Sequence, residues 1–254
     1  MNTTELKSFL DEKVNLYNRP DFISSDPISI PHLFQKKEDI EIIAFLVATI
    51  AWGKREMIIK NGLKLCELLE HEPYNFVIHH SKTDLKNLGS FVHRTFNETD
   101  LKVFLSALKH LYQNHGGLEK SFSNGDNVSE KISRFKALFF SIPHAERTEK
   151  HVSDPLKGSS AKRLNMFLRW MVRKDNNGVD FGIWNTIKPS ELYCPLDVHT
   201  GNTARKLQLL KRKQNDWKAV VELTEQLRKF DPNDPIKYDF ALFGIGVFED
   251  FLYL

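Results

Sequence analysis

Residues 156–173 read LKGSSAKRLNMFLRWMVR and join a turn of small residues to the start of a helix. Gly158 suits such a turn because glycine tolerates the positive φ that tight turns need. Lys162 follows in the first turn of the predicted helix. The apolar side chains after it recur with a helical period, which predicts one buried face. They are Leu164, Phe167, Leu168, Met171 and Val172.

A second helix start is predicted at residues 194–200, which read CPLDVHT. Asp197 is the expected N-cap, because its carboxylate can accept hydrogen bonds from the backbone amides of the first turn. His199 lies two residues further on. The polar, glycine-containing segment 174–193 connects this helix to the one that begins near Lys162.

The helical period recurs through the rest of the chain, whereas no stretch alternates with period two for long enough to predict a sheet. We therefore predict an all-α protein, and 254 residues suit one large domain or two small lobes. Residues 19–31 are rich in proline and are expected to form a non-helical connector. Further helices are predicted over residues 3–18, 38–52, 55–70, 99–113 and 128–140, and after the capping residues Asp216 and Asp234.

Positive charge is unevenly distributed along the chain. The 36 basic and 33 acidic residues give a net charge of only +3. Residues 157–174 contain six basic residues and residues 201–213 contain five, and neither stretch contains an acid. In the helix that begins near Lys162, we expect Lys162, Arg169 and Arg173 to lie largely outside the apolar face. Two such stretches indicate a phosphate-rich partner, with solvated helix faces as the alternative.

Several classes of protein are excluded by composition. The two cysteines, Cys66 and Cys194, are too few for a disulfide framework or a four-cysteine iron–sulfur site, and we expect both to be reduced thiols. The N-terminus is polar, and the longest apolar run, residues 42–52, is too short to span a bilayer. We therefore expect a soluble, intracellular protein.

The two predicted helix starts carry groups with possible chemical roles. A turn before a helix exposes backbone amides that attract anions, although many ordinary helix caps look the same. Lys162 is either a phosphate-contacting lysine or an amine nucleophile, because a helix N-terminus and the adjacent Arg163 favour the neutral amine. Asp197 is either only a cap or a carboxylate that helps to deprotonate the lysine. His199 is either a phosphate donor or a structural histidine.

These segments resemble the two signatures of the helix-hairpin-helix DNA glycosylase superfamily, nearest in motif to the 8-oxoguanine glycosylase/AP lyases. The hairpin pattern is leucine, proline, glycine, any residue, glycine, any residue, lysine, and Leu156, Gly158 and Lys162 match it in register. Lys157 replaces the proline and Ser160 the second glycine. The segment 195–199, PLDVH, resembles the second signature.

The resemblance implies a two-lobed all-α fold with a cleft between lobes, here approximately 36–173 and 1–35 plus 174–254. Lys162 would attack the sugar of a flipped, oxidised purine in double-stranded DNA, with 8-oxoguanine as the expected lesion, and Asp197 would assist. The implied protein is a bacterial, cytoplasmic, nucleoid-associated monomer. It needs no cofactor, although the hairpin is compatible with a bound monovalent cation. The DNA-binding residues would be Gly158, Ser159, Ser160, Ala161, Arg163, His199 and Arg205.

An enzyme that extrudes a base needs aromatic side chains on which the base can stack. Trp52 ends the most apolar predicted helix, and Phe181 and Trp184 lie in the connecting segment. We predict these three as base-pocket residues, with core packing as the alternative for each tryptophan. Two other functions stay open: a non-catalytic helix-hairpin-helix protein that only binds nucleic acid, and a helical interaction protein that binds none.

Overall fold

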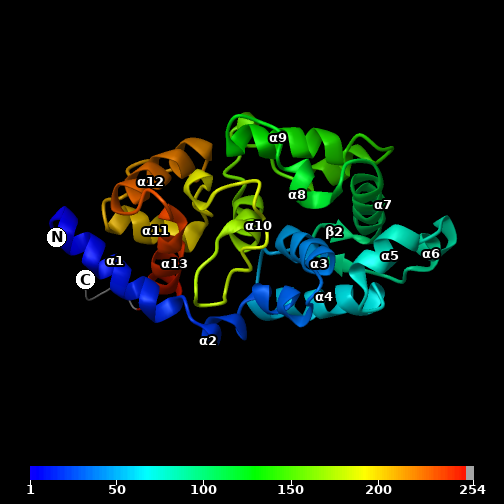
Figure 1. The fold of residues 1–254 in the computed structure, drawn as a ribbon, viewed down its shortest axis with the longest axis horizontal. Coiled ribbons are helices and arrows are strands. Elements are labelled where there is room, and N and C mark those ends of the chain that lie inside the picture. The colour runs from blue at the N-terminus through cyan, green and yellow to red at the C-terminus, as the bar shows by residue number, and fades with distance from the viewer. Residues whose placement is uncertain (250–254) are drawn as a thin grey trace. The chain divides into compact units, whose positions relative to one another are not determined.

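The computed structural model describes residues 1–249 and is mostly helical (Figure 1). Helix accounts for 64% of the protein, which confirms the predicted all-α class. Within residues 1–249 one small sheet is present, in which β1 (Val92–His93) pairs antiparallel with β2 (Phe96–Asn97). The prediction of no sheet is therefore wrong for this short hairpin, whose strands are too brief to give a period-two pattern.

The chain divides into two compact units. The terminal unit comprises Met1–Phe22 and the described residues from Asp154 onward, and the central unit is Ile23–Ser153. These boundaries differ from the expected ones at 35/36 and 173/174. Helix α10 (Lys162–Val172) belongs to the terminal unit, because its buried arginines pair with carboxylates of that unit.

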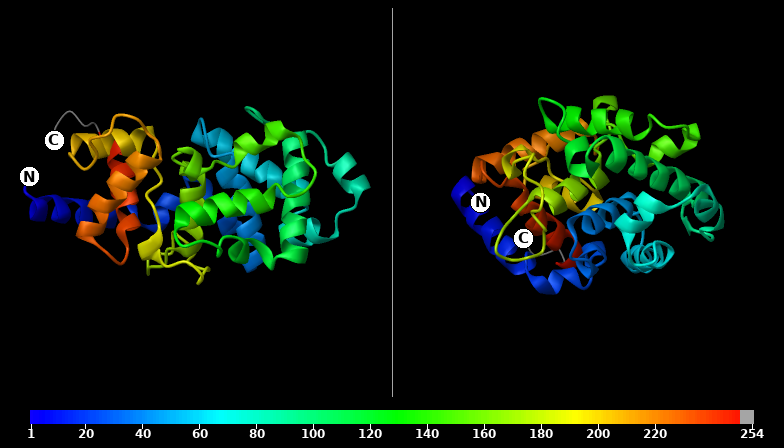
Figure 2. Two further views of the ribbon diagram at one scale, coloured as in Figure 1. Left: turned by 90° about the horizontal axis from the view of Figure 1, so that it is seen from above. Right: turned by 45° about the vertical axis from the view of Figure 1, so that its right-hand side comes forward.

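The terminal unit places the first and last helices side by side (Figure 2). The Tyr17 hydroxyl donates to Glu249 over 2.5 Å, and Lys13 pairs with the same carboxylate at 2.8 Å. Gly244 makes this packing possible, because a Cβ at that position would overlap the Tyr17 ring. Its elements are α1 (Thr3–Tyr17), η4 (Pro155–Lys157), α10, η5 (Pro189–Glu191), α11 (Val198–Lys206), α12 (Trp217–Phe230), η6 (Pro235–Lys237) and α13 (Tyr238–Phe248), while α2 (Pro20–Ile23) crosses the boundary.

The central unit is built around α3 (Lys37–Thr49), in which every residue from Ile40 to Thr49 is buried. Phe45 of α3 contacts the rings of Phe104, Phe135 and Phe139, so one aromatic cluster joins three helices. The elements of the unit are η1 (Pro27–Ser29), η2 (Pro31–Leu33), α3 (Lys37–Thr49), α4 (Arg55–Leu68), α5 (Pro73–His79), α6 (Lys82–Asn87), β1, β2, α7 (Glu98–Asn114), α8 (Gly117–Ser121), α9 (Val128–Phe139) and η3 (Glu146–His151).

Two local predictions are wrong. Residues 19–31 contain the short helices α2 and η1 and the first residue of η2, and each of these helices begins with a proline. Proline is tolerated there because the first amides of a helix have no intrahelical partner. Asp234 does not cap the last helix with its side chain, because its carboxylate accepts hydrogen bonds from Arg173.

Within residues 1–249, no helix has the length and apolar character that a membrane crossing requires.

Candidate functional site

Two helix starts of the terminal unit bring a lysine and an aspartate together. Lys162 is the first residue of α10, and Asp197 is the N-cap of α11. The Lys162 Nζ lies 3.8 Å from Asp197 Oδ2. The two side chains are 26% and 22% exposed, so both are accessible from solvent while most of their surface is covered. The amine and the carboxylate singled out in the sequence thus lie next to each other.

The Asp197 carboxylate is held in one orientation. Its Oδ1 accepts a hydrogen bond from the Thr200 amide at 2.9 Å, which confirms the predicted capping role, while Oδ2 is directed to Lys162. The Asn215 side chain donates to the Asp197 carbonyl at 3.1 Å. Because one oxygen is used by the cap, the other is presented to the lysine in a fixed position.

The turn before α10 has the predicted left-handed glycine. Gly158 has φ +87°, and a Cβ built there would meet nothing within 4 Å, so the outer side of the turn is open. Ala161 precedes α10 with φ +46°, an uncommon conformation for a residue with a Cβ, and gives the helix no side-chain cap. The Gly158 carbonyl accepts a hydrogen bond from the Trp217 amide, and Ser159 forms a β-bridge with Asp216.

The predicted role of the hairpin amides needs correction. The Gly158 amide donates to the Pro155 carbonyl at 2.9 Å, and the Ser159 amide donates to Asp154 at 3.3 Å. The Ala161 amide donates to the Ser159 hydroxyl at 3.2 Å. These three donors are therefore used inside the chain, because residues 155–157 form the 3₁₀ helix η4 and the turn after it closes on its own backbone and on the Ser159 hydroxyl. The uncapped start of α10 remains a place for an anion.

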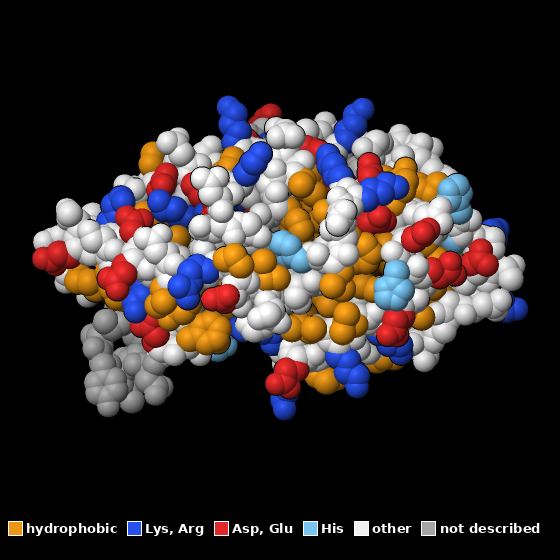
Figure 3. Space-filling model, turned by 60° about the horizontal axis from the view of Figure 1, so that its bottom comes forward, with side chains coloured by type: hydrophobic (Ala, Val, Ile, Leu, Met, Phe, Trp, Pro, Cys, Tyr) orange, Lys and Arg blue, Asp and Glu red, His pale blue; other side chains and the backbone are white. Residues whose placement is uncertain are grey.

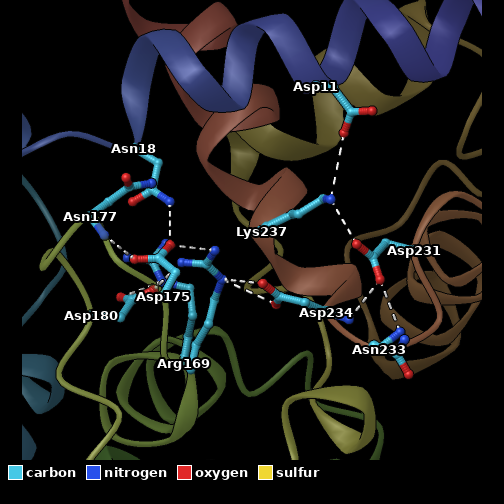
Figure 4. Close-up of polar contacts among 11 residues, drawn as sticks. Asp11, Asn18, Arg169, Asp175, Asn177, Asp180, Asp231, Asn233, Asp234 and Lys237 are labelled. Carbon is cyan, nitrogen blue, oxygen red and sulfur yellow. Dashed lines mark hydrogen bonds and ion pairs between the residues drawn. The ribbon is translucent and has the colours of Figure 1, made fainter.

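Arg169 and Arg173 are buried, contrary to the prediction that they lie outside the apolar face. Arg169 pairs with Asp239 at 2.5 Å and with Asp180 at 3.2 Å. Arg173 pairs with the carboxylates of Asp175 (2.7 Å), Asp180 (3.1 Å) and Asp234 (3.0 Å). Figure 4 shows Arg169 of α10 beside Asp175 and Asp180 of the connecting segment 174–193, with Asp234, which precedes η6 and α13, close to them. Two of the six cations in residues 157–174 are thus unavailable to a phosphate.

Asp239 is a functional candidate that the sequence reasoning missed. It lies in the first turn of α13, is 4% exposed, and contacts Cys194 Sγ at 3.9 Å in addition to Arg169. Burial and repulsion by Asp197 raise its pKa to about 6, against the opposing effect of Arg169 and Lys162. The sequence does contain a signal for this residue, namely an acid within an otherwise apolar helix, because a buried carboxylate requires a partner.

The remaining predicted DNA-binding residues have different environments. His199 is exposed, and its Nδ1 lies 3.2 Å from the Gly246 carbonyl, which orients the ring. Arg205, in the last turn of α11, is directed to the loop that follows the helix, where it donates to the Arg212 carbonyl and to Asn215. Arg163 is only partly exposed, and burial lowers its pKa to about 10. Of the three, His199 is the most accessible.

The predicted base-pocket residues are not brought together in one unit. Trp52 lies in the central unit, where its ring stacks on His151 with centroids 5.9 Å apart. Trp184 is only 2% exposed and packs edge-on against Phe167, so its prediction as a pocket residue is wrong. Phe181 is partly exposed, and its amide donates to the Trp170 carbonyl.

Among residues 1–249, no group of three or more histidine, cysteine, aspartate or glutamate side chains has an arrangement that could hold a metal ion. The fold and the site define a mostly α-helical protein with a lysine–aspartate pair at two helix starts. The chain belongs to the family described as "Protein of unknown function (DUF2400)", whose model matches residues 26–248. No curated protein and no solved structure matches the chain.

Proposed function

We propose that the protein is a DNA glycosylase with AP-lyase activity, with a two-lobed fold of the helix-hairpin-helix glycosylase type. The observation that carries this proposal is the 3.8 Å contact between Lys162 Nζ and Asp197 Oδ2 at two helix starts. The hairpin resemblance supplies the reaction class, and an oxidised purine such as 8-oxoguanine is the proposed substrate.

The proposed reaction uses both members of the pair. Asp197 accepts a proton from the lysine ammonium, and the free amine attacks C1′ of a flipped nucleotide. The new C–N bond forms while the bond from C1′ to the base breaks, and the base leaves with the electron pair and is protonated. Opening of the sugar ring gives a Schiff base on Lys162. Loss of a C2′ proton then expels the 3′ phosphate and cleaves the strand.

The pair is better suited to chemistry than to stability. An ion pair with side chains about a quarter exposed contributes only ~0–1 kcal/mol to folding. The carboxylate is nevertheless held by the Thr200 amide in an orientation that serves the lysine. Substitution of either residue should therefore change activity much more than it changes stability.

Borohydride trapping tests the proposal. Wild-type protein is incubated with duplex oligonucleotides that contain 8-oxoguanine or another oxidised base, and a covalent adduct is expected after reduction. Lys162→Gln and Lys162→Arg should abolish the adduct, and Asp197→Asn, which keeps a capping oxygen, should greatly reduce it. Lys60→Gln, at an exposed lysine of α4, is the matched control and should trap normally. No adduct with any oxidised base, or an adduct that survives Lys162→Gln, contradicts the proposal.

A non-catalytic nucleic-acid-binding protein is the second candidate. It is favoured by the hydrogen bonds that join the hairpin to the start of α12, shortly after the basic residues Lys211, Arg212 and Lys213. Lys162→Arg distinguishes the two functions because it keeps the positive charge but removes the nucleophilic amine. The second candidate is favoured if the wild-type protein forms no adduct and the Lys162→Arg variant binds DNA as tightly as the wild type does.

A further inference from the structure

A cationic hollow is formed in the terminal unit by the loop that connects α11 to α12 and by the first two turns of α12. Its volume is about 520 Å³, and its lining contains four cations and one acid: Lys211, Arg212, Lys213, Gln214, Lys218 and Glu222. We call this group the cationic hollow. The hollow is shallow and open to solvent, and its excess of positive charge attracts a polyanion.

The two acids near the hollow, Glu222 and Asp216, both accept hydrogen bonds from residues of the loop before α12. The Glu222 carboxylate accepts a hydrogen bond from the Lys211 amide at 2.6 Å. Asp216 is bound by Arg212, and this contact lowers the Asp216 pKa to about 2, so that the pair is ionised at neutral pH. With Arg212 and Asp216 paired, the hollow presents the charge of its three lysines less that of Glu222, because a neutral backbone amide does not cancel the charge of that carboxylate.

The cationic hollow is attached to the candidate active site. Trp217 donates its amide to the Gly158 carbonyl at 3.0 Å, and Asp216 forms a β-bridge with Ser159. In the same loop, the Asn215 side chain donates to the Asp197 carbonyl. The loop that carries the hollow is thus hydrogen-bonded both to the hairpin before Lys162 and to the backbone of Asp197, the N-cap of α11.

We propose that the cationic hollow binds the phosphodiester backbone of the DNA strand whose nucleotide is presented to Lys162. The identity of this ligand rests on the proposed function. The lysines contact phosphates without reading bases, so they contribute affinity and register but no sequence specificity. The loop takes over part of the anion binding that the hydrogen-bonded amides of Gly158, Ser159 and Ala161 do not provide.

The test is the salt dependence of binding to an undamaged fluorescent duplex, measured by anisotropy. The variant with Lys211→Gln, Lys213→Gln and Lys218→Gln should bind at least tenfold more weakly at low salt. The slope of log affinity against log salt should become shallower by about 2–3, because each lost phosphate contact contributes roughly 0.9. Circular dichroism spectra confirm that the variant is folded, and the three single variants should each give part of the change.

The matched control carries Lys60→Gln, Lys64→Gln and Lys86→Gln, which removes the same charge from the central unit. Its slope should equal that of the wild type. Equal slopes for both triple variants and the wild type, or an equal loss in both variants, overturn the inference. Borohydride trapping is measured separately. If the triple variant of the hollow binds DNA more weakly and with a smaller salt slope, while the wild-type protein forms no adduct, the hollow is supported as a DNA-binding surface and the proposed glycosylase activity is rejected.

Discussion

Asp239 combines burial with three charged neighbours. Its carboxylate contacts Arg169 directly, and Asp197 and Lys162 act on it electrostatically. Arg169 is shared with Asp180, so it compensates the Asp239 charge only in part. The raised pKa is thus the expected result of burial plus repulsion by Asp197, and Asp239 couples the buried ion pairs to the candidate active site.

The pH dependence of stability should reveal this carboxyl. With a folded-state pKa of about 6 and a lower unfolded value, the folded protein binds the proton more tightly. Asp239 therefore destabilises the fold as the pH rises from about 4 to 6, by roughly 2–3 kcal/mol. Asparagine has no such transition. Urea unfolding at several pH values should show wild-type stability falling relative to Asp239→Asn across this range; a constant difference contradicts the assignment.

At the scale of elements, α10 shows what could be predicted from the sequence. Its start after Ala161, the left-handed Gly158 and the capping role of Asp197 follow from local spacing. The burial of Arg169 and Arg173 does not, because their partners lie up to 70 residues away in the sequence. The same limit applies to the hairpin, since the loop before α12 that pairs with it is distant in sequence. Local patterns identified the Lys162–Asp197 pair, whereas contacts between elements supplied its surroundings.

The anchoring of α10 by Arg173 predicts a large loss of stability. Arg173→Met leaves the buried Asp180 without one of its two cations and also removes the partner of Asp175 and Asp234. Removing one member of a buried ion pair costs about 3–5 kcal/mol. Lys174→Met, at the exposed neighbouring position, should change the free energy of unfolding by less than about 0.5 kcal/mol. Chemical denaturation compares the two, and a similar small effect for both would show that the network contributes little.

At the scale of the whole molecule, net charge says little about where a ligand binds. Lysine and arginine side chains are interspersed with aspartate and glutamate on the face shown in Figure 3. The total of +3 hides both the internal pairing of Arg169 and Arg173 and the concentration of lysines in the cationic hollow. The two basic stretches were visible in the sequence. Their division into buried and accessible cations required the fold.

The division into two compact units predicts that local damage stays within one unit. Gly244 of α13 has no space for a Cβ beside the Tyr17 ring, and Gly62 of α4 has none beside Ile30. Each alanine substitution should destabilise by about 1–3 kcal/mol through overpacking. Gly244→Ala should accelerate amide hydrogen exchange in α1 and α13, and Gly62→Ala should do so in α3 and α4. Each variant thus serves as the control for the other. Equal acceleration in all four helices with either variant would mean that the units open together, because only a shared opening transmits damage from one core to the other.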